Sequence, residues 1–307
     1  MTTVLTRTRG IARRSGRRRQ RDEGRVAALF LTPTLGGFAL FTLLPILGAL
    51  VVALTVWPLA GTPTFVGLEN FVALFQDEAF LGSVVVTLIF VVVYVPLNLV
   101  LSLAVAAWIS PRIRGGNIYR LLFFIPVVTP MVANAAVWQM LLIPGGALDS
   151  VSLSLFGTHA PNILGQSSSA LAAVVVMSLW QGFGYNLLIF TSALRGVSEN
   201  VLDAAMIDGA GAVRRFFSIR LPMISPSIFF ATTMTMITSF QVFAQPYVLT
   251  SGGPDSATTT MVMYLYRQGF QYFDLGYASA IGVMLFLMIL AISGVVFLLQ
   301  KRWVHYE

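Results

Sequence analysis

The sequence predicts an all-helical integral membrane protein with six transmembrane helices and both termini in the cytoplasm. Three observations support this class: the composition, the recurrence of long apolar runs, and the placement of the basic residues. Hydrophobic residues make up 57% of the chain and charged residues only 10%, and the mean hydropathy is +0.82. A soluble globular protein carries far more charge, because its surface must be hydrated. That class is therefore excluded.

Six apolar runs are long enough to cross a hydrocarbon layer of about 30 Å, which takes about 20 helical residues. They predict transmembrane helices at about 26–57, 82–110, 118–143, 171–194, 223–249 and 277–299. The transmembrane domain therefore covers residues 26–300, between an Arg-rich tail at 1–25 and a short tail at 301–307. Because the first run contains Pro33 and Pro45, we expect it to be tilted, kinked or partly re-entrant.

Basic residues predict the orientation, because short loops that carry Lys and Arg stay in the cytoplasm. Eighteen of the nineteen basic residues fall in the two tails and in alternate connections, nine of them within residues 7–25. The other connections, at 58–81, 144–170 and 250–276, contain only Arg267 together with acidic residues. Both tails are therefore predicted to be cytoplasmic. We interpret the Arg-rich tail as a topogenic segment that rests on anionic lipid, and we expect no nucleic acid partner.

The predicted cytoplasmic loop at 195–222 is too long for a simple turn and has a helical pattern of its own. Ser198 is placed to cap a helix that begins with Glu199 and continues through good helix formers. Gly209 is expected to end that helix. A second short amphipathic piece, at 213–219, follows and is expected to end before Pro222, which cannot continue a helix from within. The sequence thus predicts a helix-turn-helix pair on the cytoplasmic side.

Two interpretations of this helix pair are open on physical grounds. In the first, the pair lies flat on the membrane surface, with Phe216 and Phe217 in lipid and Arg214 and Arg215 among the phosphates. In the second, the pair lays its apolar face into the groove of a soluble partner protein.

The spacing of residues in the loop resembles a family motif. The pattern DAA-x3-G-x9-I-x-LP, which starts at Asp203, is similar to the EAA loop of binding-protein-dependent ABC importer permeases. One position departs from the family pattern, because Asp203 stands where the family has Glu. The resemblance implies that Asp203–Gly209 form the coupling helix that contacts the ATP-binding subunits. Coupling roles are implied for Glu199, Asp203, Ala204, Ala205, Asp208, Gly209, Ile219, Leu221 and Pro222.

Two further segments resemble the maltose-type carbohydrate branch of this family. They are FVGLENFVALFQDEAF at 65–80 and the run from YVLTSGGPD to the last apolar segment at 247–282. The resemblance implies the type I ABC importer permease architecture in the cytoplasmic membrane of a prokaryote. The implied partners are a second similar permease in a heterodimer, two copies of an ATP-binding subunit, an extracytoplasmic solute-binding protein and membrane lipid. The implied solute is a sugar, a polyol or a glycerol phosphodiester.

Motifs for catalysis are missing from the sequence, so we expect no enzyme activity, no metal site and no bound cofactor in this chain. ATP hydrolysis needs a glycine-rich loop with a lysine that reaches the phosphates, yet the only lysine, Lys301, follows Gln300. ATP and Mg²⁺ are therefore expected on the partner subunit. TSGGPD at 250–255 is interpreted as an external turn. His159 and His305 are predicted on opposite membrane faces, and the chain has no cysteine.

Uncharged polar and aromatic residues within the predicted helices are candidates for a solute path, since a polyol needs hydrogen-bonding partners and flat apolar faces. Several lie four residues apart and so on one helix face. These candidates are Asn134, Trp138, Gln139, Trp180, Gln181, Tyr185, Asn186, Thr238, Gln241 and Gln245. The same side chains can instead join helices to one another. Two other functions remain open: a secondary carrier that works without ATP, and a membrane scaffold that transports nothing.

Overall fold

The computed structural model describes residues 28–57, 61–109 and 116–304. Regular structure in this part of the chain is almost entirely helical, which confirms the predicted all-helical class. Some predicted features lie outside the described residues, namely the tail at 1–25, Arg112, Arg114 and His305.

The first of two structural units, Met1–Val52, contains most of one apolar helix, Ala28–Ala53. Its middle turn, η1 (Ala39–Leu43), is π-helical, and α2 (Leu44–Ala53) continues from it. Pro45 follows the π-helical turn by two residues. A proline ring collides with the carbonyl group four residues earlier in an α-helix, and a widened turn relieves that contact. The helix therefore passes this proline without ending.

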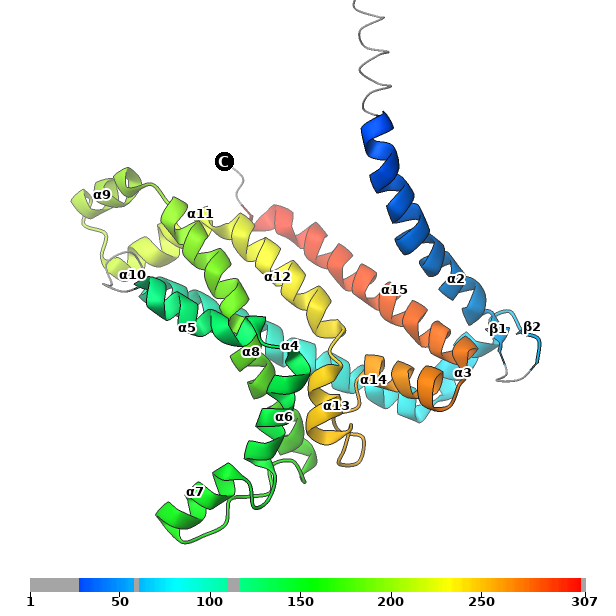
Figure 1. Cartoon of the computed structure of the whole chain (residues 1–307). Helices are drawn as coiled ribbons and strands as arrows, with labels where there is room; N and C mark the ends of the chain where they lie inside the picture. The colour runs from blue at the N-terminus through cyan, green and yellow to red at the C-terminus, as the bar shows by residue number, and fades with distance from the viewer. Residues whose placement is uncertain (1–27, 58–60, 110–115, 305–307) are drawn as a thin grey trace, which may run out of the picture. The chain divides into compact units, whose positions relative to one another are not determined.

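The second unit, Ala53–Glu307, opens with two short antiparallel strands and continues as a series of helices (Figure 1). The strands are β1 (Thr55–Val56) and β2 (Thr64–Phe65). The helices are α3 (Glu69–Gln76), α4 (Glu78–Trp108), α5 (Gly116–Val128), α6 (Met131–Leu142), α7 (Ala147–Phe156), α8 (Ser167–Gly196), α9 (Glu199–Ile207), α10 (Ala212–Arg215), η2 (Phe216–Arg220), α11 (Leu221–Met223), α12 (Ser225–Phe240), α13 (Ala244–Thr250), α14 (Met261–Tyr266), η3 (Arg267–Gln271), α15 (Leu275–Leu299) and η4 (Gln300–Arg302).

Within the described ranges, five helices are long and apolar enough to cross a membrane. They are Ala28–Ala53, Glu78–Trp108, Met131–Phe156, Ser167–Gly196 and Leu275–Arg302. A sixth candidate is a bent pair, in which Ala212–Met223 meets Ser225–Phe240 at 68°. With this pair counted as one span, the number agrees with the six that the sequence predicts.

Two predicted transmembrane helices are interrupted in the structure. The apolar run at 118–143 divides between α5 and α6, because Pro130 disfavours a helical conformation at the residue before it. The run at 223–249 divides after Phe240, and the chain re-enters a helix at α13. Pro246 lies in the first turn of α13, where its missing N–H has no helical acceptor to lose. The structure therefore divides two of the apolar runs that the sequence predicts as transmembrane helices.

The helix α8 lies at the centre of the second unit and packs against α4, α5, α12 and α13. Figure 1 shows α9 and α10 at one end of α8, which we call the α9 end, and α6 and α7 toward the other. Packing against α5 is close: a Cβ atom at Gly184 would lie 2.2 Å from the carbonyl oxygen of Phe123. Small residues let membrane helices approach each other in this way.

The substitution Gly184→Ala is expected to destabilise the protein, because the added methyl group collides with a backbone carbonyl that cannot rotate away. Overpacking of this kind costs about 1–3 kcal/mol. Thermal unfolding of the purified chain in detergent measures the effect. Gly196→Ala is the matched control, since Gly196 is also in α8 and has nothing within 4 Å of its added Cβ. Equal unfolding temperatures for the two variants would contradict the close-packing explanation.

Candidate functional site

The loop between α8 and α12 begins with the helix that the sequence predicts, α9. Gly209 follows it with φ +79°, a left-handed conformation that residues with a Cβ atom rarely adopt. The predicted end of the helix is therefore confirmed. The predicted cap was wrong, because Ser198 occupies the N-cap position but its side chain makes no capping hydrogen bond.

The second half of the loop is longer than the sequence predicts. α10, η2 and α11 form one helical segment, Ala212–Met223, which contains Pro222. The π-helical turn η2 ends two residues before this proline, as η1 does before Pro45. The prediction that Pro222 ends the segment was wrong, because the widened turn accommodates the ring. The axis changes direction only at Ile224, which separates α11 from α12.

One face of α9 is buried and the other is open. Leu202 is buried among apolar side chains of α4, α8 and α12, while Asp203 and Ala204 are exposed and Ile207 is 88% exposed. We call the buried group the α9 cluster; it includes Leu202, Ala106, Phe190, Leu194, Ile224 and Ala231. Leu202 therefore connects α9 to an apolar cluster that includes residues of three long helices.

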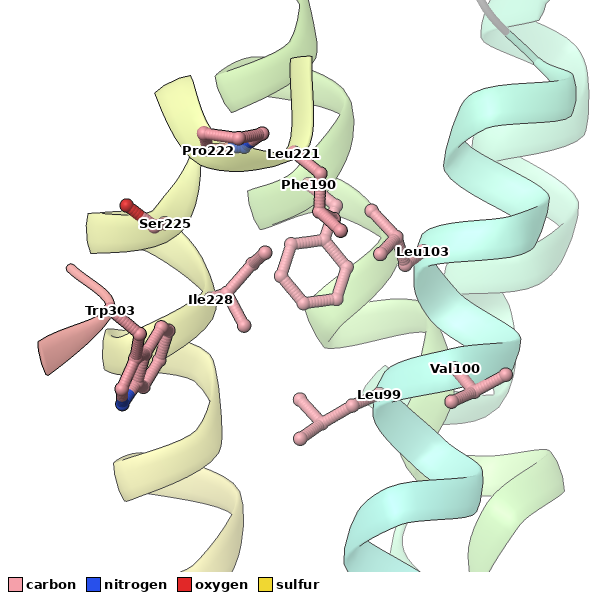
Figure 2. A pocket seen from close by; sticks show the side chains of 9 residues that line it. All are labelled: Leu99, Val100, Leu103, Phe190, Leu221, Pro222, Ser225, Ile228 and Trp303. Atoms are coloured by element: carbon pink, nitrogen blue, oxygen red, sulfur yellow. The ribbon is translucent and has the colours of Figure 1, made fainter. Parts of the chain in front are cut away.

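The other predicted coupling residues divide into three groups. Glu199 and Asp208 are exposed beside the open face of α9. Ala205 is partly buried, and Ile219 packs against the α9 cluster. Leu221 and Pro222 line a separate apolar cavity, which Figure 2 shows.

The membrane-surface interpretation requires both Phe216 and Phe217 to face lipid, but the structure places the two side chains in different environments. Phe216 packs against the α9 cluster, whereas Phe217 is 61% exposed. The structure therefore leaves one aromatic side chain and the open face of α9 for contact with lipid or protein.

A cavity of about 360 Å³ opens between α4, α8 and the break that joins α12 to α13. Three predicted path residues, Thr238, Gln241 and Gln245, lie in its lining. The full lining is Phe90, Tyr94, Met131, Ser178, Thr238, Ser239, Gln241, Val242, Phe243, Ala244 and Gln245. The prediction that Gln241 and Gln245 share one helix face was wrong, because Gln241 lies in the break between α12 and α13.

Three other predicted path residues donate hydrogen bonds to backbone carbonyl groups near helix ends and breaks. The Asn134 amide reaches the Pro126 oxygen at 3.2 Å, a carbonyl whose α-helical donor would be the N–H that Pro130 lacks. The Gln181 amide donates to the Thr129 oxygen at 3.1 Å, and Gln139 donates to the Leu249 oxygen at 3.4 Å. These amides therefore join helices, as the alternative interpretation of the sequence expects.

Asn186 connects three helices beside the cavity. Its amide donates to Asn98 Oδ1 in α4 and to Thr235 Oγ1 in α12, both at 2.7 Å. Asn98 in turn donates to the Tyr94 hydroxyl at 3.2 Å, and Tyr94 lines the cavity. Neither Tyr94 nor Asn98 was among the residues predicted for the solute path. The two are four residues apart in an apolar run, which is also the spacing of the predicted pairs.

Trp138, Trp180 and Tyr185 lie outside the cavity lining. The rings of Trp138 and Trp180 are 5.8 Å apart, while Trp180 is 41% exposed and Tyr185 is 47% exposed. The structure therefore does not bring these three predicted path residues to the cavity.

Four aromatic rings that the sequence analysis did not select extend from the cavity. Phe243 lies in the lining and stacks on Tyr247 at 5.0 Å, and Tyr266 contacts both rings at 5.1 and 5.5 Å. Phe270 stacks on Tyr266 at 5.4 Å and is exposed. We call these four residues the aromatic column. It joins the break before α13 to the helix formed by α14 and η3.

A partly buried carboxylate, Asp77, connects the segment before α4 to α14 and α15. The hydroxyls of Tyr264 and Tyr277 both donate to Asp77 Oδ2, at 2.5 and 2.6 Å, and the Ala79 N–H donates to Oδ1 at 2.9 Å. Burial opposes ionisation, but these hydrogen bonds outweigh it and lower the pKa of Asp77. Burial and the nearby charge of Asp77 raise the pKa of Tyr264 to about 12. At neutral pH the arrangement is therefore one carboxylate shared by two neutral phenols.

The remaining predictions for polar residues concern His159 and the TSGGPD run. His159 Nδ1 lies 3.0 Å from Asp149 Oδ2, which also accepts the Gly145 N–H at 2.9 Å, so this pair closes the connection around α7. No group of three or more potential metal ligands occurs within the described residues. TSGGPD forms a turn between α13 and α14, where the Arg267 guanidinium donates to the Ser251 carbonyl at 2.6 Å.

A set of long apolar helices with a polar cavity between them and an exposed amphipathic helix at one end defines a multi-pass membrane transport subunit. The model of one family, described as "Binding-protein-dependent transport system inner membrane component", matches residues 100–305. The chain belongs to this family and is a multi-pass inner-membrane protein, as the EAA-type loop predicts.

Relatives agree along nearly the whole chain. A probable ABC transporter permease protein, YesP of Bacillus subtilis strain 168, is 35% identical over 283 residues, which cover 91% of each chain. The sn-glycerol-3-phosphate transport system permease protein UgpA of Yersinia pestis is 38% identical over 284 residues, covering 91% of this chain and 95% of that protein. The chain is therefore similar to ABC importer permeases over 91% of its length.

A solved structure shows the same fold at lower sequence identity. It is the crystal structure of a bacterial ABC transporter involved in the import of the acidic polysaccharide alginate. One of its chains aligns with a TM-score of 0.80 and 21% identity, covering 93% of this chain and 99% of that chain. A second structure of the alginate transporter, in complex with an alginate pentasaccharide-bound periplasmic protein, aligns with a TM-score of 0.77.

The substitution Asp77→Asn is expected to lower the stability of the purified chain at pH 7, because it removes the charge that both phenols bind. Hydrogen bonds to a charged group contribute about 1.5–3 kcal/mol. The pKa of Asp77 is lowered from 3.8, so this stabilisation is present above about pH 4 and is lost as the pH falls through the lowered pKa. The difference between variant and wild type should therefore shrink in acid.

Thermal unfolding followed by tryptophan fluorescence at several pH values measures this difference. Asp255→Asn is the matched control, since Asp255 is an exposed turn residue with φ +48°, which Asn tolerates well. A stability loss for Asp77→Asn that stays constant from pH 7 to below pH 4 would show that the carboxylate charge is not its cause.

Proposed function

We propose that this chain is one of two permease subunits of an ATP-driven importer and that it moves a sugar or sugar-like solute. The observation that carries the proposal is that Leu202 of α9 belongs to the same buried apolar cluster as residues of α4, α8 and α12. The first two of these helices and the end of the third flank the polar cavity. A force applied to α9 from outside the membrane therefore reaches the walls of the cavity through close-packed side chains.

The proposed source of that force is an ATP-binding subunit on the cytoplasmic side. The chain itself has one lysine and no GxxxxGK[ST] motif, so hydrolysis with ATP and Mg²⁺ belongs to the partner. α9 acts as the coupling helix, and its exposed Asp203 and Ala204 face the partner. Two such subunits, a second similar permease and an extracytoplasmic binding protein complete the assembly. The periplasmic protein in the alginate transporter complex supports the last of these partners.

The lining of the cavity supports a neutral, polyhydroxylated solute. The described lining residues include the amides of Gln241 and Gln245 and several hydroxyl groups. None of these described residues is Asp, Glu, Lys or Arg. A phosphate or carboxylate group in such a cavity would lack a cationic partner, at a large cost in desolvation. Phe243 and the aromatic column add flat apolar surfaces that suit the faces of a sugar ring.

Alternating access is the proposed mechanism. Closure of the ATP-binding subunits moves α9, the displacement passes through the α9 cluster, and α4, α8 and α12 rock around the cavity. The buried amide oxygens of Gln181 and Asn186 have no hydrogen-bond partner in the described part of the chain. They are therefore the acceptors that can form new hydrogen bonds as the helices shift.

The substitution Gly209→Trp is expected to reduce solute uptake at least tenfold while leaving membrane insertion unchanged. A residue with a Cβ atom at φ +79° costs about 1–2 kcal/mol locally, and the indole obstructs the open face beside α9. Uptake by cells and co-purification of the ATP-binding subunit measure the effect. Gly67→Trp is the matched control, because Gly67 has φ +62° and open space but lies between β2 and α3.

Loss of the ATP-binding subunit in Gly209→Trp and its retention in Gly67→Trp is the expected pattern. Normal uptake and normal co-purification with Gly209→Trp would remove the coupling role from this loop.

The substitution Gln241→Leu is expected to raise the solute concentration for half-maximal uptake several-fold, because it removes one amide from the cavity. Gln241 is exposed to the cavity, so stability should be nearly unchanged. Gln139→Leu is the contrasting variant, since its amide donates to the Leu249 carbonyl outside the cavity and its loss should lower stability instead. Unchanged uptake kinetics in Gln241→Leu, measured at equal protein levels, would exclude Gln241 from the solute path.

A further inference from the structure

A second cavity, apolar and about 430 Å³ in volume, lies at the α9 end of the second unit (Figure 2). Its lining is Leu99, Val100, Leu103, Phe190, Leu221, Pro222, Ser225, Ile228 and Trp303. These residues come from α4, α8, the α11–α12 bend and the segment after α15. Figure 2 shows Phe190 and Ile228 near the middle of the group and Trp303 at its edge. The lining shares no residue with the polar cavity, so this is not part of the proposed solute path.

The wall of this cavity continues onto the outer surface of the helices. Val100 is 66% exposed, and Trp303 is 36% exposed. An apolar groove that opens sideways between membrane helices faces lipid chains and not water. Aliphatic side chains form most of its lining, so its interior suits a hydrocarbon chain.

Cationic residues adjoin two of the lining residues in the sequence. Arg220 directly precedes Leu221, and Lys301 and Arg302 directly precede Trp303. Lys301 and Arg302 are exposed at the end of η4. Arg220 is partly buried, and its Nε atom is buried with no hydrogen-bond partner in the part of the chain that the structure describes. An anion can provide the missing partner of a buried guanidinium nitrogen of this kind.

The chemistry of the flanking residues also sets the depth of the cavity in the membrane. Tryptophan and basic side chains concentrate at the level of the lipid headgroups, where an apolar ring and a charged group are both accommodated. Trp303 beside Lys301 and Arg302 therefore places this end of the groove at the boundary between hydrocarbon and headgroups.

We propose that the apolar cavity is a binding site for an anionic phospholipid. One acyl chain occupies the groove between α4 and the α11–α12 bend, and the headgroup phosphate pairs with Arg220, Lys301 and Arg302. A net negative headgroup fits three cations better than a zwitterionic one, whose ammonium group offsets the phosphate. A soluble phosphate ion would make no contact with the apolar groove. The proposed ligand is therefore the lipid and not the free anion.

The position of Trp303 allows a direct test, because bromine atoms on an acyl chain quench tryptophan fluorescence on contact. The full chain is reconstituted in bilayers that contain either dibrominated phosphatidylglycerol or dibrominated phosphatidylcholine at increasing mole fractions. The signal of Trp303 is the difference between the wild type and Trp303→Phe, which removes the contribution of the other tryptophans. We expect half-maximal quenching of Trp303 at a several-fold lower mole fraction of phosphatidylglycerol than of phosphatidylcholine.

The triple substitution Arg220→Gln, Lys301→Gln and Arg302→Gln should abolish this preference. Arg214→Gln with Arg215→Gln is the matched control, because it removes two cations from the same loop, neither of which adjoins a residue of the cavity lining. That control should keep the preference. If the triple variant fails to fold, Lys301→Gln with Arg302→Gln at the exposed chain end still tests the headgroup contact.

Two results would overturn the proposal. One is equal quenching of Trp303 by the two lipids, and the other is a preference that survives the loss of all three cations. Millimolar inorganic phosphate in the phosphatidylglycerol experiment separates the two sources of the anion. Persistent quenching by the brominated lipid supports the phospholipid, whereas relief of the quenching would assign the cations to a soluble anion.

Discussion

Carbonyl groups freed by helix breaks inside a membrane must find donors within the protein, because lipid chains offer none. The rest of this structure depends on how that requirement is met. Pro130 interrupts the helix between α5 and α6, and Asn134 supplies the missing donor to Pro126. Gln181 of α8 donates to Thr129 at the same break. Side-chain amides therefore stabilise the irregular backbone at this break, and the helix can be discontinuous without exposing polar groups to lipid.

The broad class of the protein could be predicted because it follows from local properties. A run of about 20 apolar residues has few alternatives to a membrane helix, and the excess of basic residues in alternate connections predicts an orientation. Gly209 was also predictable, since a glycine after a helical pattern commonly adopts the left-handed conformation that it has here. The helical pattern after Ser198 predicted the observed start of α9 at Glu199.

The pairing of distant polar residues could not be predicted, because it depends on which helices become neighbours. Asn186 meets Asn98 across 88 residues and Thr235 across 49, and nothing in the spacing of these residues along the chain links them. The aromatic column is a similar case, since Phe243 and Tyr266 approach only after the turn at 250–260 reverses the chain. The prediction at Pro222 failed for a different reason. The rule that proline ends a helix assumes an α-helical turn before the proline, and here that turn is π-helical.

The bend of 68° between Ala212–Met223 and α12 determines the direction in which movement can pass from the loop into the membrane. Two rigid rods joined at such an angle convert a translation along the first into a mainly transverse displacement of the second. The anchoring of Phe216 and Ile219 in the α9 cluster keeps the first rod from sliding independently of α8. In the proposed mechanism, a push on the loop would swing the start of α12 sideways. The far end of α12, at Phe240, would then move in the opposite direction about a point that the surrounding helices hold fixed.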